Sequence, residues 1–245
     1  MCIGRLSENT VGVRMQKNIK MVVTDLDNTL LNNSSEISDY TKSILARCRR
    51  RGIKIAYATA RDAGATDRAM NALFDGAVCS NGAQAYIGDA LIHSRVVSPA
   101  HLHGLLAAAE EAGIELDIEP ERILVIDADE SLDAAAIIRR HLPEELHLLV
   151  REQGLVLVVL HREASKSGGT AALAAHWGIA PAEIAAFGDD TIDIDLLAYC
   201  GIGVAVANAP AQVKAAADFI CGSNEEDGVA RWIEEHVLSI PTKRD

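Results

Sequence analysis

Carboxylates occur in this chain at spacings that suit metal-assisted chemistry. Asp25 and Asp27 follow one apolar run, and Asp189 closely follows another. On extended backbone, side chains two residues apart project to the same side, so Asp25 and Asp27 are expected at one edge. Paired carboxylates repel each other, and one pKa rises unless a cation lies between them. Because oxygen ligands without nearby His or Cys suit a hard cation, we predict a Mg²⁺ site.

Three further residues could hold the oxygens of a phosphate group. Thr59 and Arg61 follow another apolar run, and Lys166 comes just before a predicted helix. Hydroxyl, guanidinium and ammonium groups, with the amides at helix starts, are suitable donors to phosphate. Arg61 could instead brace Asp27 through a bidentate salt bridge. The combination predicts chemistry on a phosphate ester.

These side chains can act together only if the fold brings them to the same edge of a sheet. The alternation of apolar runs with amphipathic segments predicts such a sheet. The pattern is typical of an α/β fold with a doubly wound parallel-sheet (Rossmann-like) core, in which ligands bind beyond the carboxyl ends of the strands. The predicted strands span 19–24, 53–58, 77–79, 184–187, 202–206 and 219–221, with a hairpin of 85–87 and 90–93. The predicted helices span 38–51, 62–73, 169–177, 192–199, 210–216 and 227–237.

In the middle of the chain the regular alternation of strands and helices gives way to a strand-rich pattern, which predicts an inserted, smaller α+β domain. We expect residues 1–87 and 162–245 to form the catalytic core and residues 88–161 to form a cap over the strand ends. Such lids exclude water and select the leaving group. The insert is expected to contain helices at 99–112 and 131–142 and strands at 115–118, 123–126, 147–150 and 155–160. Its candidate substrate contacts are Glu119, Arg122, Asp127, Arg151 and Glu152.

Composition and charge exclude several classes of function. The content of 49% hydrophobic and 24% charged residues is that of a globular protein, and a net charge of −12 argues against nucleic-acid and anionic-membrane partners. No apolar run approaches the roughly 18 residues of a membrane span. The five cysteines are scattered without a C-x-x-C pair, so we predict reduced thiols in a cytoplasmic protein. The oligomeric state stays open.

Each carboxylate motif alone also has a structural explanation. An Asp-x-Asp pair at a strand end can form a turn, and Asp189 with Asp190 can cap the following helix. Together with Thr59 and Lys166, in this order along the chain, the two motifs favour a catalytic site.

These motifs resemble those of the haloacid-dehalogenase superfamily. The segment from Asp25 to Leu31 resembles its first motif, Thr59 its second, Lys166 its third, and 188–193 its fourth. Residues 80–83, 176–179 and 206–209 are similar to the Cof-type branch, whose C2-type cap is inserted between the second and third motifs. The resemblance extends over residues 20–237 and is weak through the insert.

The resemblance implies a Mg²⁺-dependent phosphatase acting on a small phosphorylated metabolite, such as a sugar phosphate or a phosphoglycolate-like acid. Asp25 would be the nucleophile that forms a phospho-aspartyl intermediate, and Asp27 would be the general acid and then the base. Asp25, the backbone carbonyl of Asp27, and Asp189 would hold the metal. Thr59 and Lys166 would contact the transferring phosphoryl group, with Arg61, Asn81 and Asn208 as substrate-binding candidates and Asp193 orienting water or Lys166.

Two departures from the family pattern concern the site. Asn28 stands where the family usually has Gly, a mild change because Asn tolerates left-handed backbone. Ile192 stands where the family usually has Asn, so one contact to the metal or its surroundings is lost. Two alternatives stay open: a phosphomutase, which shares these motifs, and a non-catalytic metabolite-sensing module, which Ile192 supports. Asn81 and Asn208 could equally serve as turn residues.

Overall fold

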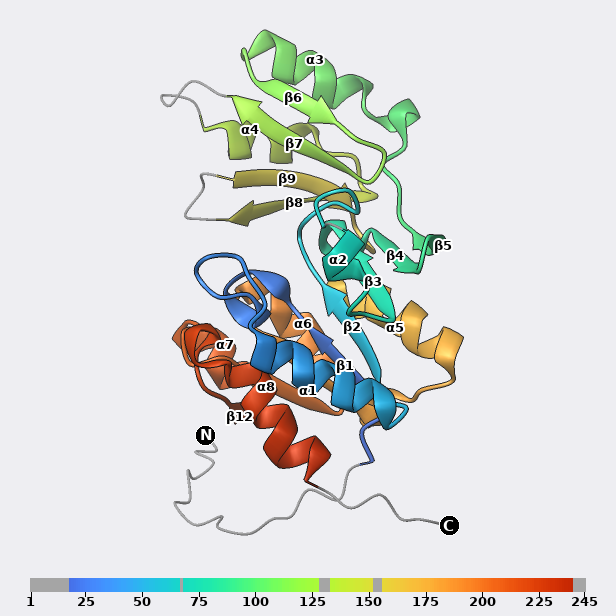
Figure 1. Ribbon diagram of the computed structural model, residues 1–245. Coiled ribbons are helices and arrows are strands. Elements are labelled where there is room, and N and C mark those ends of the chain that lie inside the picture. Colours follow the sequence, from blue (N-terminus) through green and yellow to red (C-terminus); the bar gives the residue numbers. More distant parts are fainter. Residues whose placement is uncertain (1–17, 67, 128–132, 152–155, 240–245) are drawn as a thin grey trace, which may run out of the picture.

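The computed structural model describes residues 18–66, 68–127, 133–151 and 156–239, which form two sheets with helices packed on them (Figure 1). The first sheet has eight strands in the order β12-β11-β10-β1-β2-β3-β4-β5. Its strands are β1 Met21–Thr24, β2 Lys54–Ala58, β3 Gly76–Cys79, β4 Gln84–Ile87, β5 Ala90–Ser94, β10 Ile184–Gly188, β11 Ile202–Ala205 and β12 Phe219–Ile220.

The centre of the first sheet is parallel and entirely buried. β1 pairs in parallel with β10 on one side and β2 on the other, and every residue of β1 and β10 is buried. Strands that are covered on both faces need continuous apolar runs, and such runs made it possible to predict these strands from the sequence. Because β1, β2 and β10 are parallel, their carboxyl ends lie at the same edge of the sheet. The later strands of the chain lie on one side of β1 and the earlier strands on the other, which is where ligands bind in such sheets.

Helices cover both faces of the first sheet (Figure 1). α1 packs against α8, and α5 packs against α6. The Ser38 hydroxyl caps α1 by accepting a hydrogen bond from the amide of Thr41, and Gly52 follows the helix at φ +78°. The helices are α1 Asp39–Arg50, α2 Arg68–Asn71, α5 Lys166–Trp177, α6 Ile194–Tyr199, α7 Ala211–Ala216 and α8 Gly228–Ile233.

The second sheet is antiparallel, with the order β6-β7-β9-β8. One of its faces packs on two helices through a separate apolar cluster that includes Leu105, Ile123 and Ile138. On its other face, Val158 and Leu160 join a small cluster with Ala83 of the first sheet's loops. The elements are α3 His103–Glu111, β6 Glu115–Ile118, β7 Arg122–Asp127, α4 Ala134–His141, β8 Leu146–Arg151 and β9 Val156–His161. The predicted α/β core with a smaller α+β unit is thus confirmed.

One strand of the predicted insert belongs to the first sheet. β5 pairs with β4 in an antiparallel hairpin, so this sheet continues to Ser94 and the predicted boundary after residue 87 falls inside a hairpin. The hairpin itself was predicted. Its membership of the first sheet depends on the pairing of β4 with β3, a contact that no local pattern encodes.

Several predicted helix limits are wrong. The helix expected over 62–73 is reduced to α2, because the Asp62 carboxylate accepts from the amide of Gly64 and stabilises a turn instead. α5 begins at Lys166 because the Ser165 hydroxyl caps it through the amide of Gly168. The helix expected over 192–199 begins at Ile194. Residues 131–132 and 155 of the predicted elements, and the candidate contact Glu152, lie outside the described residues.

Among the described residues, no helix combines the length and the apolar character needed to cross a membrane. A cytoplasmic location stays a prediction.

Candidate active site

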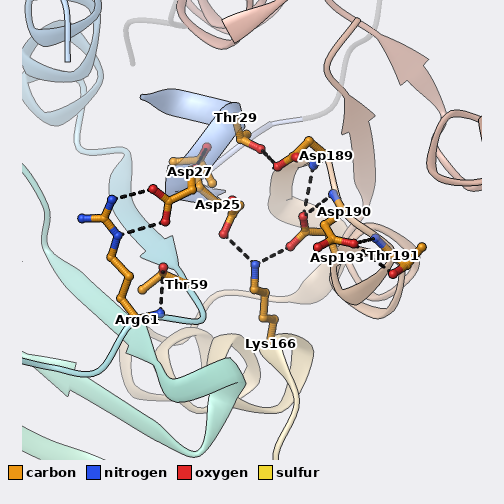
Figure 2. Close-up of polar contacts among 11 residues, drawn as sticks. Asp25, Asp27, Thr29, Thr59, Arg61, Lys166, Asp189, Asp190, Thr191 and Asp193 are labelled. Atoms are coloured by element: carbon orange, nitrogen blue, oxygen red, sulfur yellow. Dashed lines mark hydrogen bonds and ion pairs between the residues drawn. The ribbon is translucent and has the colours of Figure 1, made fainter. Parts of the chain in front are cut away.

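The predicted site residues lie around the carboxyl ends of neighbouring parallel strands (Figure 2). Asp25 directly follows β1, and its backbone amide donates to the carbonyl of Phe187 in β10 at 2.9 Å. Thr59 directly follows β2, and Asp189 directly follows β10. Strand pairing therefore brings together residues that lie more than a hundred positions apart in the sequence.

Lys166 joins two carboxylates in the interior of the site. Its ammonium nitrogen lies 2.6 Å from Asp25 Oδ1 and 2.6 Å from Asp193 Oδ1, and its side chain is 2% exposed. Burial alone would lower the pKa of Lys166, but Asp193 and Asp25 outweigh burial and raise it above the usual range. Lys166 is therefore a permanent cation between these two acids.

Asp193 connects Lys166 to the loop that carries Asp189. Its second oxygen accepts hydrogen bonds from the backbone amides of Asp189 and Asp190, both at 3.0 Å. The loop approaches so closely that a Cβ at Gly188 would lie 2.4 Å from the Cβ of Asp193. Asp193 thus orients Lys166, one of the two roles that the family resemblance implied, and it also fixes the backbone at Asp189.

Asp27 has a different cation from Asp25. Arg61 forms a bidentate pair with it, with Nε to Oδ2 at 2.9 Å and Nη2 to Oδ1 at 2.5 Å. Figure 2 shows the two carboxylates of Asp25 and Asp27 facing different partners. Asn28 follows at φ +58°, the left-handed conformation expected at this position. Arg61 therefore forms the bidentate salt bridge to Asp27 that was one of its two predicted roles. The other predicted role of Arg61, as a ligand of the substrate, stays a prediction.

The loops after β2 and β3 contribute buried polar groups. The hydroxyl of Thr59, which is fully buried, accepts from the amide of Arg61 at 3.2 Å. The amide of Asn81 donates to the carbonyl of Thr59 at 3.0 Å. Among the described residues, Ser80 Oγ and Asn81 Oδ1 are buried without a hydrogen-bond partner. Two such groups beside Thr59 are available to a bound ligand.

Asn208 has a structural role at the rim of the site. Its amide nitrogen donates to the carbonyl of Asn28 at 2.7 Å, and its oxygen accepts from the amide of Asn224 at 3.1 Å. Asn208 thereby links the turn after Asp27 to a distant loop. Ile192 is half-buried in the turn Thr191–Asp193.

Two residues of the site were missed by the sequence analysis. The Thr29 hydroxyl donates to Asp189 Oδ1 at 2.6 Å, and Asp195 Oδ2 accepts from the amide of Ser167 at 3.0 Å. Thr29 lies two residues after Asp27, within the first motif, which is the only signal that could have indicated it.

The charges of the site fit a divalent cation. Oxygens of Asp25, Asp189 and Asp193 lie within 4.8 Å of one another, and Lys166 is the cation paired among them. Three carboxylates and one ammonium leave two negative charges in excess. Burial raises the pKa of Asp25, which Lys166 only partly offsets, and burial raises that of Asp189 to about 6. A hard divalent ion held by oxygens of Asp25 and Asp189, beside Asp193, would remove the excess charge and favour the ionised forms.

Comparison with known proteins identifies the family of the chain. A family model described as haloacid dehalogenase-like hydrolase matches residues 22–145 and 117–233. YxeH of Bacillus subtilis strain 168, whose name places it among phosphatases, is 26% identical over 271 residues, covering 90% of this chain and 99% of YxeH. A phosphoglycolate phosphatase of Methanoculleus marisnigri is 31% identical over 133 residues, covering 51% of this chain and 54% of its own.

A solved structure extends the likeness to the whole fold. The subclass IIB sugar phosphatase BT4131 superposes with a TM-score of 0.75 at 22% identity, covering 88% of this chain and 98% of that chain. Because the family model matches both halves of the chain, the chain belongs to the haloacid dehalogenase-like hydrolases.

Proposed function

We propose that the chain is a Mg²⁺-dependent phosphatase that hydrolyses a small phosphomonoester through a phospho-aspartyl intermediate on Asp25. The observation that carries the proposal is the separation of two carboxylates by their cations. Asp25 is buried against Lys166, whereas Asp27 is 47% exposed at its side chain and pairs with Arg61. A nucleophile and a general acid need different environments, and these two residues have them.

In the first step, Asp25 forms a bond to phosphorus while the bond from phosphorus to the ester oxygen breaks. The departing oxygen takes a proton from Asp27. Lys166 and Thr59 would contact the phosphoryl oxygens, and Asn81 Oδ1 and Ser80 Oγ lie buried beside Thr59. The half-exposed carboxyl of Asp27 can obtain its proton from solvent.

In the second step, Asp27 accepts a proton from water as the water oxygen bonds to phosphorus. The bond between phosphorus and Asp25 then breaks, which releases inorganic phosphate and regenerates the free carboxylate. Asp25, Asp189 and the backbone carbonyl of Asp27 would hold Mg²⁺, which would neutralise the charge shared by nucleophile and phosphate.

We propose that the second sheet and its helices act as the cap over this edge. Its antiparallel strands lie between residues 115 and 161, within the predicted insert of 88–161. The names of the relatives favour a sugar phosphate or phosphoglycolate as substrate, and a compact cap is consistent with a small leaving group.

The test is the release of inorganic phosphate from a panel of sugar phosphates and small phosphorylated acids. We expect release with Mg²⁺, none with EDTA, and none from Asp25→Asn, whose carboxamide is a poor nucleophile. Stoichiometric release from a monoester would also exclude a phosphomutase. Full turnover by Asp25→Asn would show that Asp25 is not the nucleophile, provided that contaminating phosphatase and deamidation of the new Asn back to Asp are ruled out. No release from any compound by a folded, Mg²⁺-binding protein would favour the non-catalytic alternative.

A further inference from the structure

Arg122 reaches from the second sheet to the loop that follows β2 in the first sheet. Its Nη2 lies 3.2 Å from Asp62 Oδ2, and its Nη1 donates to the carbonyl of Ala60 at 3.2 Å. On its own sheet, Nε donates to Glu119 Oε2 at 2.6 Å. The Arg122 side chain is 11% exposed, so these contacts are made largely out of solvent.

The single positive charge of Arg122 is already more than neutralised by two carboxylates. Glu119 and Asp62 both contact the guanidinium, and the neutral carbonyl of Ala60 takes a further donor. A phosphate group would have to displace these partners. Arg122 is therefore better suited to hold protein backbone than to bind the phosphate of a substrate.

The two core residues that Arg122 holds stand on either side of Arg61. Arg61 in turn donates both arms of its guanidinium to Asp27. The loop has no helix to stiffen it, since α2 begins only at Arg68. Contacts therefore run without interruption from β7 through the backbone at residues 60–62 to Arg61 and the carboxylate of Asp27.

The other contacts described near the junction of the two sheets, an apolar cluster and the ion pair of Arg95 with Glu163, do not include residues 60–62. Val158 and Leu160 of β9 pack against Ala83 and Ala164 in a small apolar cluster. Apolar contact tolerates sliding, whereas a planar guanidinium with several fixed acceptors defines an orientation. Arg122 is thus the side chain through which the position of the second sheet can act on the loop around Arg61.

We propose that Arg122 is a positioning residue for proton transfer: it fixes Arg61, and through Arg61 the carboxyl of Asp27, relative to the leaving group. The inference rests on the proposed function, in which Asp27 protonates the departing oxygen. Its consequence is that docking of the second sheet and assembly of the acid/base group are coupled.

The test exploits the dependence on the leaving group. Alkyl phosphates need protonation of the departing oxygen, whereas p-nitrophenyl phosphate has a stable leaving anion and needs little. In Arg122→Met we expect kcat/KM for an alkyl phosphate to fall about tenfold or more, a part of the 10²–10⁴ typical of a general acid. For p-nitrophenyl phosphate we expect a fall of less than about threefold. A purely structural or binding role would reduce both values equally.

Matched variants separate the possible outcomes. Arg95→Met removes an exposed arginine that pairs with Glu163 near the same sheet junction, and it should leave the ratio of the two kcat/KM values unchanged. Asp62→Asn weakens one contact of Arg122 without altering β7, and it should shift the ratio in the same direction as Arg122→Met. If Arg122→Met fails to fold, Asp62→Asn takes its place in the test.

Asp27→Asn is the reference, because it should shift the ratio most. If Asp27→Asn leaves the ratio unchanged, the proposed acid role of Asp27 is wrong. If Asp27→Asn shifts the ratio while Arg122→Met and Asp62→Asn reduce both substrates in parallel, the acid role stands and the positioning role of Arg122 is overturned.

Discussion

Asp193→Asn tests whether the buried charges hold the site together. The substitution preserves shape but leaves a single acceptor oxygen where the carboxylate had two. That carboxylate accepts from Lys166 on one oxygen and from the amides of Asp189 and Asp190 on the other. Whichever way the new carboxamide is oriented, its NH₂ group meets other donors. The variant therefore leaves at least one buried donor unsatisfied.

The expected loss of stability follows from these contacts. Breaking a buried ion pair typically costs about 3–5 kcal/mol. Because Lys166 retains Asp25 at 2.6 Å, we take the lower end, about 3 kcal/mol. For a chain of 245 residues this corresponds to a fall in Tm of roughly 6–12 °C. Mg²⁺ affinity should fall as well, because the loop at Asp189 loses its anchor.

The assay is thermal unfolding followed by circular dichroism, with Asp195→Asn as the control. Asp195 is also a partly buried aspartate near the start of α6, but it accepts a single backbone hydrogen bond in the described structure, from the amide of Ser167. Its loss should cost about 1 kcal/mol. If the two variants unfold within about 2 °C of each other, in a range where 1 kcal/mol is worth 2–4 °C, the reasoning about buried charge is refuted.

Three further predictions concern other parts of the structure. Thr29→Val removes the hydrogen bond to Asp189, so Mg²⁺ affinity measured by calorimetry should fall about tenfold with Tm nearly unchanged; unaltered affinity would contradict the role of Thr29. Gly82→Ala places a Cβ 1.8 Å from a backbone carbonyl at φ +95°, so folded protein should be lost, whereas Gly88→Ala, with open space, should still fold. Burial lowers the pKa of His147 below 6.5, so the unfolded chain binds the proton more readily and stability falls as the pH drops below 6.5. The Tm of His147→Phe should therefore depend less on pH between 7 and 5.5 than that of the unaltered protein, and parallel curves would refute this.

The sequence predicted the parts of the fold that depend on burial. β1, β2 and β10 are apolar because both faces of the sheet are covered, and polar residues at their ends mark where each strand meets solvent or ligand. Once a parallel sheet is inferred, the strand ends must lie at one edge. The sequence alone therefore predicts that Asp25, Thr59 and Asp189 lie at the same edge of the sheet.

The pairing of side chains was beyond the sequence. Nothing local determines whether Arg61 contacts a ligand or Asp27, because the choice depends on how the loop after β2 is held. That loop was expected to be helical, yet Asp62 stabilises a turn and is itself held by Arg122, a residue 60 positions away. Helix propensity cannot compete with a contact of this kind, and no pattern within the loop reveals it.

The different surroundings of Asp25 and Asp27 explain how two identical side chains two residues apart can have different roles. Lys166 and Asp25 are 2% and 9% exposed at their side chains, so water screens their attraction little and the carboxylate stays directed into the site. Arg61 and Asp27 are 27% and 47% exposed, so that pair is weaker and open to water. A nucleophile needs a fixed direction of attack, whereas a group that acts first as acid and then as base must be reached by the water whose proton it takes in the second step. Order along the chain does not distinguish the two residues. The contact with Lys166 supports Asp25 as the nucleophile, and exposure to water supports Asp27 as the acid and base.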